Sequence, residues 1–415
     1  MRKSIKILLF VMIFIITACL GGYYISQEKE VANDNVMNLD TKKEQNEEIP
    51  EKSIVINKEQ IEEKTTLEKI EAYMQEMTIE EKIGQLFMIA IRKDNQGIPI
   101  TQMNEEVKEL LATYPVGGII LFKENIETTE QVEKLINDLQ ASSTIPLFIG
   151  VDEEGGNVSR VGSNSQISEV PFQAAFSIGE IGDTQLAYKE ALRMGKLLSS
   201  LGFNMNFAPV ADIYNEPNNT VIGKRSFGKT AETVTPMVIS FAQGLAKEGI
   251  QPVLKHFPGH GNTLEDSHEG LAYITKSLED LEAEEIIPFT KALELGVGAL
   301  MRGHLVVKGV DEHTPASLST IWGKYLLDHY NCDEVLLMTD AMDMGAIRNK
   351  YSVEEAALLC IEAENDICLM PADIGKAYNA LLESYKEGKL TEERINRSVR
   401  KILSKKVTLN SFVLE

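Results

Sequence analysis

Cysteine is scarce in this sequence, because the 415 residues include four. That number is too small for a fold held together by several disulfides. Three of the four lie in the second half of the chain, at Cys332, Cys360 and Cys368. Cys360 and Cys368 could pair in an oxidising compartment, but their apolar sequence contexts favour buried free thiols.

Basic residues are also fewer than acidic residues. The chain has 41 Lys and Arg against 63 Asp and Glu, which gives a formal net charge of −22. This balance excludes nucleic-acid binding driven by phosphate contacts over the whole chain, so we expect no nucleic-acid partner. The hydrophobic fraction of 43% is that of an ordinary globular protein.

The N-terminal apolar run, Ile7–Ile16, is shorter than the ~20 residues that a membrane-spanning helix requires. It follows a cluster of basic residues and precedes Cys19, which predicts a signal peptide over residues 1–18. An uncleaved N-terminal anchor is the alternative. The segment resembles a bacterial lipobox, which implies lipidation of Cys19 and an extracytoplasmic lipoprotein anchored to the cell membrane.

The segment after this cysteine is rich in charge. Residues 20–64 contain 11 acidic and 6 basic residues, and no aromatic residue after Tyr24. A segment of this composition cannot bury enough apolar surface to fold. Residues 19–64 are therefore predicted to be a charged, extended tether.

From residue 65 onward, apolar runs bounded by Gly, Pro or Asp alternate with stretches of 3.6-residue periodicity. Eight of these runs are predicted to be strands: Ile83–Ile91, Gly118–Phe122, Pro146–Val151, Asn204–Pro209, Pro252–His256, Ala299–His304, Val335–Thr339 and Asp366–Leu369. Helices are predicted within Thr184–Leu201, Ala231–Glu248, Ser277–Leu295, Ser352–Glu364 and Thr391–Ser404. Runs that are apolar on both faces are typical of parallel strands buried between layers.

Eight strands that alternate with helices predict one α/β domain over residues 65–415, a single (β/α)8 barrel of the TIM type. A doubly wound open sheet is the alternative, but no glycine-rich phosphate loop is present. In such barrels the site lies at the carboxyl ends of the strands. Polar residues stand at these ends here, namely Asp152, Asp212, Lys255, His256, His304 and Asp340. This set suits a polyhydroxylated ligand.

Histidine is concentrated in one segment, since three of the six histidines fall within Lys255–His268. Its Gly and Pro residues predict a loop. Asp266 and His268 are two positions apart, so in an extended segment their side chains share a face. The carboxylate would orient the imidazole and stabilise its charged form, which makes a proton-transfer dyad. Structural hydrogen bonding and a metal site are the alternatives, the latter weakened by the lack of HxH or HExxH spacing.

Two other groups of polar residues are candidates for chemistry. Asp340 follows a predicted strand and is placed to attack an electrophilic carbon, although it could equally be a helix N-cap. Asp343 is the competing carboxylate, which we expect to be structural. Asp152 and Arg160 flank a glycine turn and could bind sugar hydroxyls.

Together these segments resemble glycoside hydrolase family 3 and, within it, the bacterial β-N-acetylglucosaminidases of the NagZ type. Lys255–His268 matches the family signature K-H-F-P-G-H-G-x-x-x-x-D-S-H at every fixed position, which is a specific signal. Asp152–Arg160 is similar to D-x-E-G-G-x-V-x-R, and Gly202–Asp212 to G-x-N-x-x-x-A-P-V-x-D. Ile222–Phe227 resembles I-G-x-R-S-F, and Thr339–Met342 resembles the nucleophile segment.

The resemblance implies a retaining exo-β-N-acetylglucosaminidase that removes terminal N-acetylglucosamine from peptidoglycan fragments without a cofactor or metal. Asp340 would be the nucleophile, and His268, paired with Asp266, the acid/base. The substrate-binding residues would be Asp152, Arg160, Arg225, Lys255, His256, His260 and His304. Arg302 departs from the family pattern, which usually has a small residue there, so the contacts of its loop are left open.

Two other functions stay open at this point. An N-acetylglucosaminide phosphorylase could use the same residues, because imidazole repels phosphate less than a carboxylate does. A non-catalytic, lipid-anchored sugar-binding protein would not need Asp266, His268 and Asp340 together. The expected partners are a glycan substrate, N-acetylglucosaminyl muropeptides, and the membrane through the lipid anchor; we expect a monomer.

Overall fold

The computed structural model describes residues 65–263 and 270–409, together with residues 412 and 414. All of them lie in the unit Glu62–Glu415. The predicted signal peptide and tether lie outside the described residues, and so do residues 264–269, which include Asp266 and His268.

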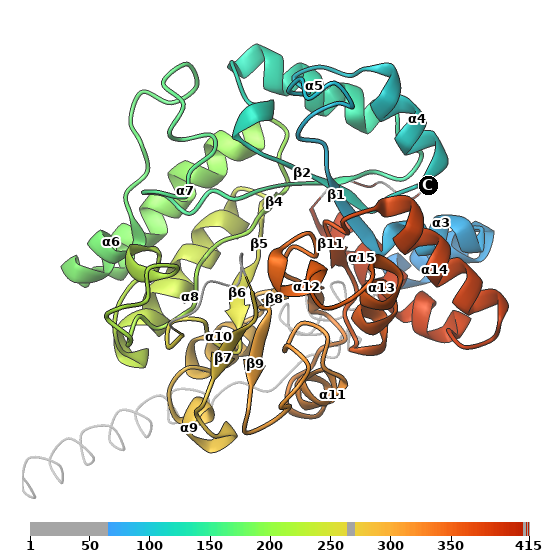
Figure 1. Cartoon of the computed structure of the whole chain (residues 1–415). Helices are drawn as coiled ribbons and strands as arrows, with labels where there is room; N and C mark the ends of the chain where they lie inside the picture. The colour runs from blue at the N-terminus through green and yellow to red at the C-terminus, as the bar shows by residue number, and fades with distance from the viewer. Residues whose placement is uncertain (1–64, 264–269, 410–411, 413, 415) are drawn as a thin grey trace, which may run out of the picture. The chain divides into compact units, whose positions relative to one another are not determined.

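Parallel strands occupy the centre of the unit (Figure 1). One sheet has the order β11-β1-β2-β3-β4-β5 and a second has the order β10-β8-β6. Their bounds are β1 Phe87–Ala90, β2 Gly118–Leu121, β3 Phe148–Val151, β4 Met205–Asn206, β5 Gln251–Pro252, β6 Leu254–Phe257, β8 Ala299–Arg302, β10 Leu336–Thr339 and β11 Cys368–Leu369. Each of the eight predicted strand regions overlaps at least one of these strands.

The two sheets are joined at both of their edges. Val210 forms a parallel bridge with Lys255 on one side, and Met338 forms one with Ile367 on the other. β5 and β6 are two parts of one run that is interrupted at Val253. The arrangement confirms the α/β class with parallel strands and is consistent with a TIM-type barrel.

Helices surround these strands in Figure 1. Residues 65–76 are helical, and the later helices are α3 Ile79–Gln85, α4 Glu105–Thr113, α5 Thr129–Ala141, α6 Ala175–Ile181, α7 Thr184–Ser200, α8 Ala231–Lys247, α9 Leu278–Ala283, α10 Ile287–Glu294, α11 Thr320–His329, α12 Gly345–Arg348, α13 Val353–Glu362, α14 Ile374–Lys386 and α15 Glu392–Thr408, with short 3₁₀ turns η1 Lys123–Asn125 and η2 Gly223–Arg225. The predicted helices near residues 184, 231, 352 and 391 are confirmed. Ser352 and Thr391 cap the last two of these.

The strand predicted over Ile83–Ile91 is wrong in its first half. Thr78 and Glu81 form a capping box, in which the Thr78 side chain accepts from the Glu81 N–H and the Glu81 carboxylate accepts from the Thr78 N–H. This start signal opens helix α3, and β1 begins only at Phe87. The capping box was readable in the sequence, but the apolar run that follows it masked the boundary.

The helix predicted over Ser277–Leu295 is two helices. Ser277 and Asp280 form a capping box at the start of α9. The chain then leaves helical geometry at Glu284, and Pro288 lies in the first turn of α10. A small parallel sheet of β7 Ala272–Ile274 and β9 Leu305–Val307 was also not predicted.

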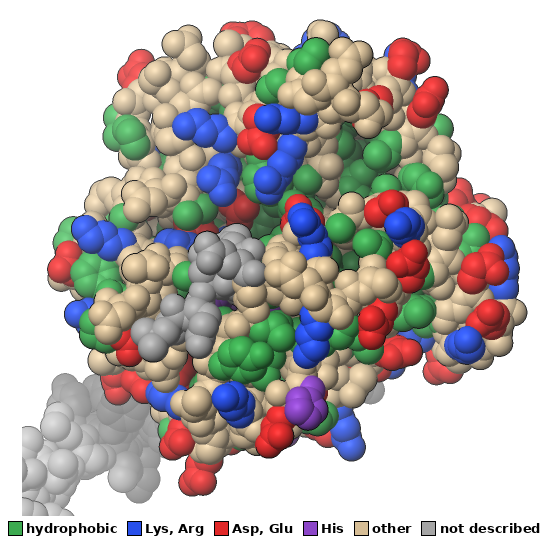
Figure 2. Space-filling view, viewed as in Figure 1, with side chains coloured by type: hydrophobic (Ala, Val, Ile, Leu, Met, Phe, Trp, Pro, Cys, Tyr) green, Lys and Arg blue, Asp and Glu red, His purple; other side chains and the backbone are tan. Residues whose placement is uncertain are grey.

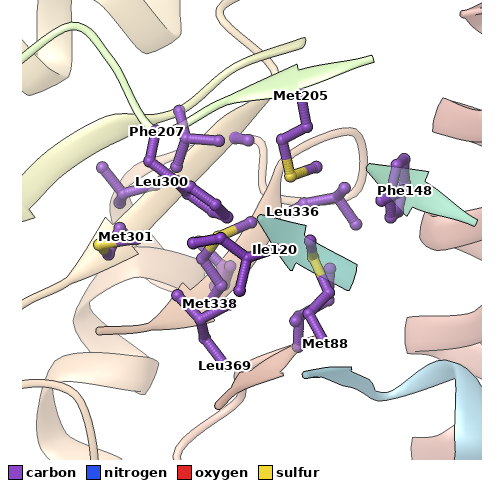
Figure 3. Close-up of a cluster of buried hydrophobic side chains, with 14 of the residues drawn as sticks. Met88, Ile120, Phe148, Met205, Phe207, Leu300, Met301, Leu336, Met338 and Leu369 are labelled. Atoms are coloured by element: carbon purple, nitrogen blue, oxygen red, sulfur yellow. The ribbon is translucent and has the colours of Figure 1, made fainter. Parts of the chain in front are cut away.

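The interior between the strands is filled with apolar side chains (Figure 3). They include Met88, Ile120, Phe148, Met205, Phe207, Leu300, Met301, Leu336, Met338 and Leu369, all buried. Gly150 allows Phe207 to pack closely, because a Cβ there would lie 2.8 Å from the Phe207 ring. Methionine suits such an irregular interior because its unbranched side chain adapts to gaps.

The amino-terminal end of the strands is also closed. Lys406, from α15, is fully buried, and its Nζ donates to Gln85 Oε1 at 2.6 Å, just before β1. The same Nζ lies 5.1 Å from the centre of the Phe148 ring at the start of β3. Burial lowers the pKa of Lys406 to about 7.

Cys332, Cys360 and Cys368 are buried and unpaired, which confirms the prediction of free thiols. Of the helices in the described ranges, none combines the length and apolar character that crossing a membrane demands.

Candidate functional site

A cavity of about 490 Å³ opens at the carboxyl ends of the strands. Ile120, Phe207, Met301 and Leu369 line it, so the top of the apolar interior forms the floor of the cavity. Of the predicted site residues, those that line it are Asp152, Arg160, Arg225, Lys255, His256, His260 and Asp340. The volume is in the range of small-molecule sites.

Four charged side chains form one network in this cavity. Lys255 Nζ lies 2.8 Å from Asp152 Oδ1 and 2.6 Å from Glu154 Oε1. Arg225 donates from Nε and Nη2 to the two Glu154 oxygens, each at 2.8 Å. Asp152 and Glu154 come from the loop after β3, Lys255 from β6 and Arg225 from η2.

Electrostatics keep the members of this network ionised. Burial alone would raise the pKa of Glu154, but Arg225 and Lys255 together hold it far below its usual range. Burial alone would lower the pKa of Lys255, and Asp152 and Glu154 raise it instead. Sequence reasoning did not select Glu154 as a site residue, although it fills the fixed Glu of the family segment that begins at Asp152.

The loop after β3 turns sharply so that Arg160 returns to the cavity wall. Gly155 has φ +84°, and a Cβ there would lie 2.2 Å from the Gln173 carbonyl oxygen. The buried Glu153 carboxylate accepts from the backbone N–H groups of Arg160, Val161 and Gly162 at 2.9, 2.7 and 3.1 Å. Burial raises the pKa of Glu153 against these hydrogen bonds.

Lys255 and His256 are consecutive in a strand, yet both line the cavity. Side chains in a regular strand alternate between faces. β6 is irregular, because Leu254 pairs with Leu300 and Phe257 pairs with Arg302, so three steps on β6 match two on β8. This bulge turns both side chains inward.

Asp212 forms hydrogen bonds to the first part of the histidine segment, at His256 and His260. Its Oδ2 lies 2.7 Å from His256 Nδ1, and its Oδ1 accepts from the backbone N–H groups of His256 and His260 at 3.1 and 2.7 Å. A carboxylate oxygen accepts, so Nδ1 of His256 donates in this hydrogen bond. The other ring nitrogen, Nε2, lies 3.4 Å from Arg225 Nη2. In the sequence, Asp212 was noted as a polar strand end and as the last residue of the family segment Gly202–Asp212, but it was not selected as a site residue.

His260 is buried beside His256, with ring centres 5.9 Å apart. Burial, followed by the charge of His256, lowers the pKa of His260 to about 4, so its imidazole is neutral at pH 7. Within residues 65–263 and 270–409, no three His, Cys, Asp or Glu side chains are grouped to hold a metal ion.

Asp340 stands directly after β10 on the cavity wall. Its N–H donates to the Arg302 carbonyl at 2.9 Å, and its Oδ1 accepts from the Ala341 N–H at 2.8 Å. Burial would raise the pKa of Asp340, but His256, His304 and the Ala341 N–H outweigh burial and lower it. Asp340 is not a helix N-cap, because the next helix, α12, is preceded by Met344.

Asp343 also lines the cavity, although we expected a structural role from the sequence. Burial raises its pKa, and the charges of Arg92 and Arg348 oppose that shift. These two arginines line the cavity as well, together with Phe122, and sequence reasoning selected none of the three.

His304 does not line the cavity, in contrast to its predicted place on the rim. It is fully buried, and its Nε2 lies 2.9 Å from the Ala341 carbonyl oxygen, which can only accept. Burial lowers the pKa of His304, its Nε2 donates to that carbonyl, and its Nδ1 lies 2.7 Å from Ser317 Oγ. His304 therefore supports the chain beside Asp340 from behind.

Arg302 also points away from the cavity and is fully buried. Its guanidinium donates to the Ala316 carbonyl at 2.9 Å, the Ser319 carbonyl at 2.9 Å and Asn365 Oδ1 at 3.2 Å, and it also contacts the Ala363 carbonyl. Burial lowers its pKa to about 10, which leaves it charged at pH 7. The contacts of this loop, left open by the sequence, are thus with the protein framework.

Comparisons with known proteins show what this chain is similar to. A family model described as "Glycosyl hydrolase family 3 N terminal domain" matches residues 78–405. "Beta-hexosaminidase A" of Pseudoalteromonas piscicida is 32% identical over 80% of this chain, which spans 62% of that protein's length. "Beta-hexosaminidase LpqI" of Mycobacterium tuberculosis is 31% identical over 79% of this chain and 82% of its own. A solved glycoside hydrolase family 3 β-N-acetylglucosaminidase from Paenibacillus sp. str. FPU-7 is 36% identical, with a TM-score of 0.74 over 81% of this chain and 63% of that one.

The first testable prediction concerns Arg302. Arg302→Lys keeps the charge, but one ammonium group cannot replace a guanidinium that reaches four acceptors on two separate segments. Buried carbonyls left without a donor cost free energy, so we expect the free energy of unfolding to fall by about 2–4 kcal/mol. Urea denaturation measures it. An unchanged unfolding free energy would show that these contacts do not stabilise the fold.

Proposed function

This chain belongs to glycoside hydrolase family 3. We propose that it is a retaining exo-β-N-acetylglucosaminidase that removes terminal N-acetylglucosamine from peptidoglycan fragments. The observation that carries the proposal is an ionised Asp340 on the wall of a cavity whose other wall is the network of Asp152, Glu154, Lys255 and Arg225. The two hexosaminidases named above support the sugar class by similarity.

The sugar-binding groups of this proposal offer both donors and acceptors. Asp152 accepts hydroxyl protons, while Lys255 and Arg160 donate to hydroxyl oxygens. Nε of Arg160 is buried and has no hydrogen-bond partner in the described part of the chain, so a ligand oxygen would satisfy it. His256 lines the cavity with its Nε2 3.4 Å from Arg225 Nη2. An uncharged sugar with several hydroxyls meets such a set without leaving charges unpaired.

Asp340 is the proposed nucleophile. Its Oδ1 accepts from the Ala341 N–H, and in the described residues no hydrogen bond is made to Oδ2, which we assign as the attacking atom. Oδ2 bonds to the anomeric carbon while the bond from that carbon to the leaving oxygen breaks. His268, oriented by Asp266, gives its proton to the leaving oxygen. Water then attacks the anomeric carbon, His268 takes its proton, and the ester to Asp340 breaks.

The second prediction tests the nucleophile. Asp340→Asn is expected to lower kcat on para-nitrophenyl β-N-acetylglucosaminide by about 10³-fold or more, because the amide cannot form the glycosyl ester. Asp343→Asn is the matched control, since it removes the neighbouring carboxylate of the same wall, and a much smaller loss is expected. If Asp343→Asn causes the large loss of kcat and Asp340→Asn the small one, the nucleophile is assigned to the wrong residue.

The same assay separates a hydrolase from a phosphorylase. Free N-acetylglucosamine in the presence and in the absence of inorganic phosphate is the expected product. N-acetylglucosamine 1-phosphate would make the chain a phosphorylase. No sugar release under either condition, from protein that unfolds cooperatively, would favour a sugar-binding protein.

The third prediction tests the acid role of His268. Protonation matters most when the leaving group is a poor one, so His268→Ala should slow a disaccharide far more than a nitrophenyl glycoside. The ratio of the two kcat/KM losses is the measurement, and about 10²-fold is expected. Equal losses on both substrates would argue against proton donation by this residue.

We also propose that Cys19 carries the lipid anchor, as the N-terminal sequence implies, with residues 19–64 as a tether that reaches the cell-wall glycan. The fourth prediction is that Cys19→Ser abolishes labelling by a fatty acid and releases the protein from the membrane fraction. Cys332→Ser, at a buried thiol, is the control and should leave both unchanged. If labelling persists in Cys19→Ser, Cys19 does not carry the lipid anchor.

A further inference from the structure

The cavity holds a second group of charged side chains, distinct from the network around Glu154. Arg92, Arg160 and Arg348 all line it. Arg92 follows β1, Arg160 lies in the loop after β3, and Arg348 ends α12, so distant segments bring them together. Figure 2 shows Lys and Arg side chains around the hollow on this face of the molecule. In a chain with a net charge of −22, such a gathering does not follow from composition.

In the described part of the chain, these arginines have few carboxylate partners. The Cζ atoms of Arg92 and Arg160 lie 3.6 and 5.9 Å from the centre of the same Phe122 ring. Arg92 Nε is 4.0 Å from Glu124 Oε1, at the outer limit of an ion pair. In the described part of the chain, no carboxylate forms an ion pair with Arg160 or Arg348.

The contrast with Arg225 is informative. Arg225 donates twice to Glu154 at 2.8 Å, whereas, among the described residues, Arg348 donates only to the Asp343 backbone carbonyl, at 3.5 Å. The Asp343 carboxylate is near enough to Arg92 and Arg348 for their charges to oppose the rise in its pKa. Two carboxylates, those of Asp343 and Glu124, stand against three guanidinium groups, so this side of the cavity is positive.

An N-acetylglucosamine unit is uncharged and does not require this positive charge. The charge therefore faces a part of the substrate beyond that unit. A carboxylate matches a guanidinium in both charge and geometry, because its two oxygens accept two parallel N–H groups. The guanidinium of Arg92 lies over the ring of Phe122, which is buried.

We propose that Arg92 and Arg348 form an anion-binding rim that selects leaving groups bearing a carboxylate, such as the lactyl carboxylate of an N-acetylmuramyl residue. The inference rests on the proposed function, because it names the group next to the sugar that is released. Arg160 is assigned to the released sugar, and Arg92 and Arg348 carry the selectivity.

The experiment uses the purified full chain and three disaccharides with N-acetylglucosamine at the released end. The partner sugar is N-acetylmuramic acid, its lactyl methyl ester, or N-acetylglucosamine. The wild type is expected to favour the acid over the ester by about five- to ten-fold in kcat/KM, the size of one or two partly exposed ion pairs. Raising the salt concentration should reduce this ratio, since exposed charges are screened.

In the double variant Arg92→Gln/Arg348→Gln, the acid-to-ester ratio should fall to about one, because only the charged contacts are removed. Arg397→Gln is the matched control. Arg397, on α15, is 41% exposed where Arg92 is 45% exposed, and it does not line the cavity. This control should keep the ratio of the wild type.

Three outcomes would contradict the proposal of an anion-binding rim. The wild type could cleave acid and ester equally well. The double variant could lose activity on all three disaccharides by the same factor, which would assign the arginines to the released sugar or to folding. Formation of a sugar phosphate that depends on Arg92 would assign the rim to inorganic phosphate.

Failure of the proposed function gives a different result, namely no cleavage of any of the three. The rim is then tested by calorimetric binding of N-acetylmuramic acid and of its methyl ester. Tighter binding of the acid that is lost in the double variant supports the rim even without catalysis. Equal binding of the two overturns it.

Discussion

The buried carboxylate of Glu154 is the interaction on which the rest of the site depends. It is held by the bidentate contact with Arg225 and by Lys255, and its side chain is 3% exposed. Each of the three residues comes from a different loop or strand. Removing one partner of such a buried pair leaves an uncompensated charge, which costs about 3–5 kcal/mol. The ion pairs therefore fix three segments in one arrangement, and Asp152 is placed by the same lysine.

This arrangement also sets the electrostatics that the sugar would meet. Asp152 and Glu154 balance Lys255 and Arg225, so the inner network carries no net charge and suits an uncharged sugar. Asp340 stays ionised because imidazoles and a backbone N–H outweigh its burial. The surplus positive charge lies at Arg92 and Arg348, away from the network. A single cavity thus contains a neutral subsite, a nucleophile and a cationic rim.

Much of this was predictable from the sequence. Apolar runs ending in Asp, Lys or His marked the strands and their carboxyl ends, and seven of the eight predicted catalytic and binding residues that the structure describes line the cavity. Glu154 was missed because an acidic residue beside two glycines is common in turns, although it fills the fixed Glu of the family segment. Arg92 and Phe122 were missed because each follows its strand as a single residue without a motif. The bulge at Lys255 and His256 depends on pairing with β8, which local sequence does not encode.

His304 shows why a polar strand end is not sufficient for a binding role. Both of its ring nitrogens have protein partners, Ser317 and the Ala341 carbonyl, so it has no hydrogen-bonding capacity left for a ligand. The Arg302 guanidinium is likewise occupied by framework oxygens.

By contrast, Arg160 Nε and Asp340 Oδ2 retain capacity that a substrate could fill. A buried polar group that the protein itself satisfies stabilises the fold, and one that it leaves unsatisfied lowers stability until a ligand binds. By this criterion the framework residues of the site are those whose hydrogen bonds are complete. The departure at Arg302 from the family's small residue is therefore compatible with an intact site, because its side chain binds the framework while its backbone carbonyl accepts from the Asp340 N–H.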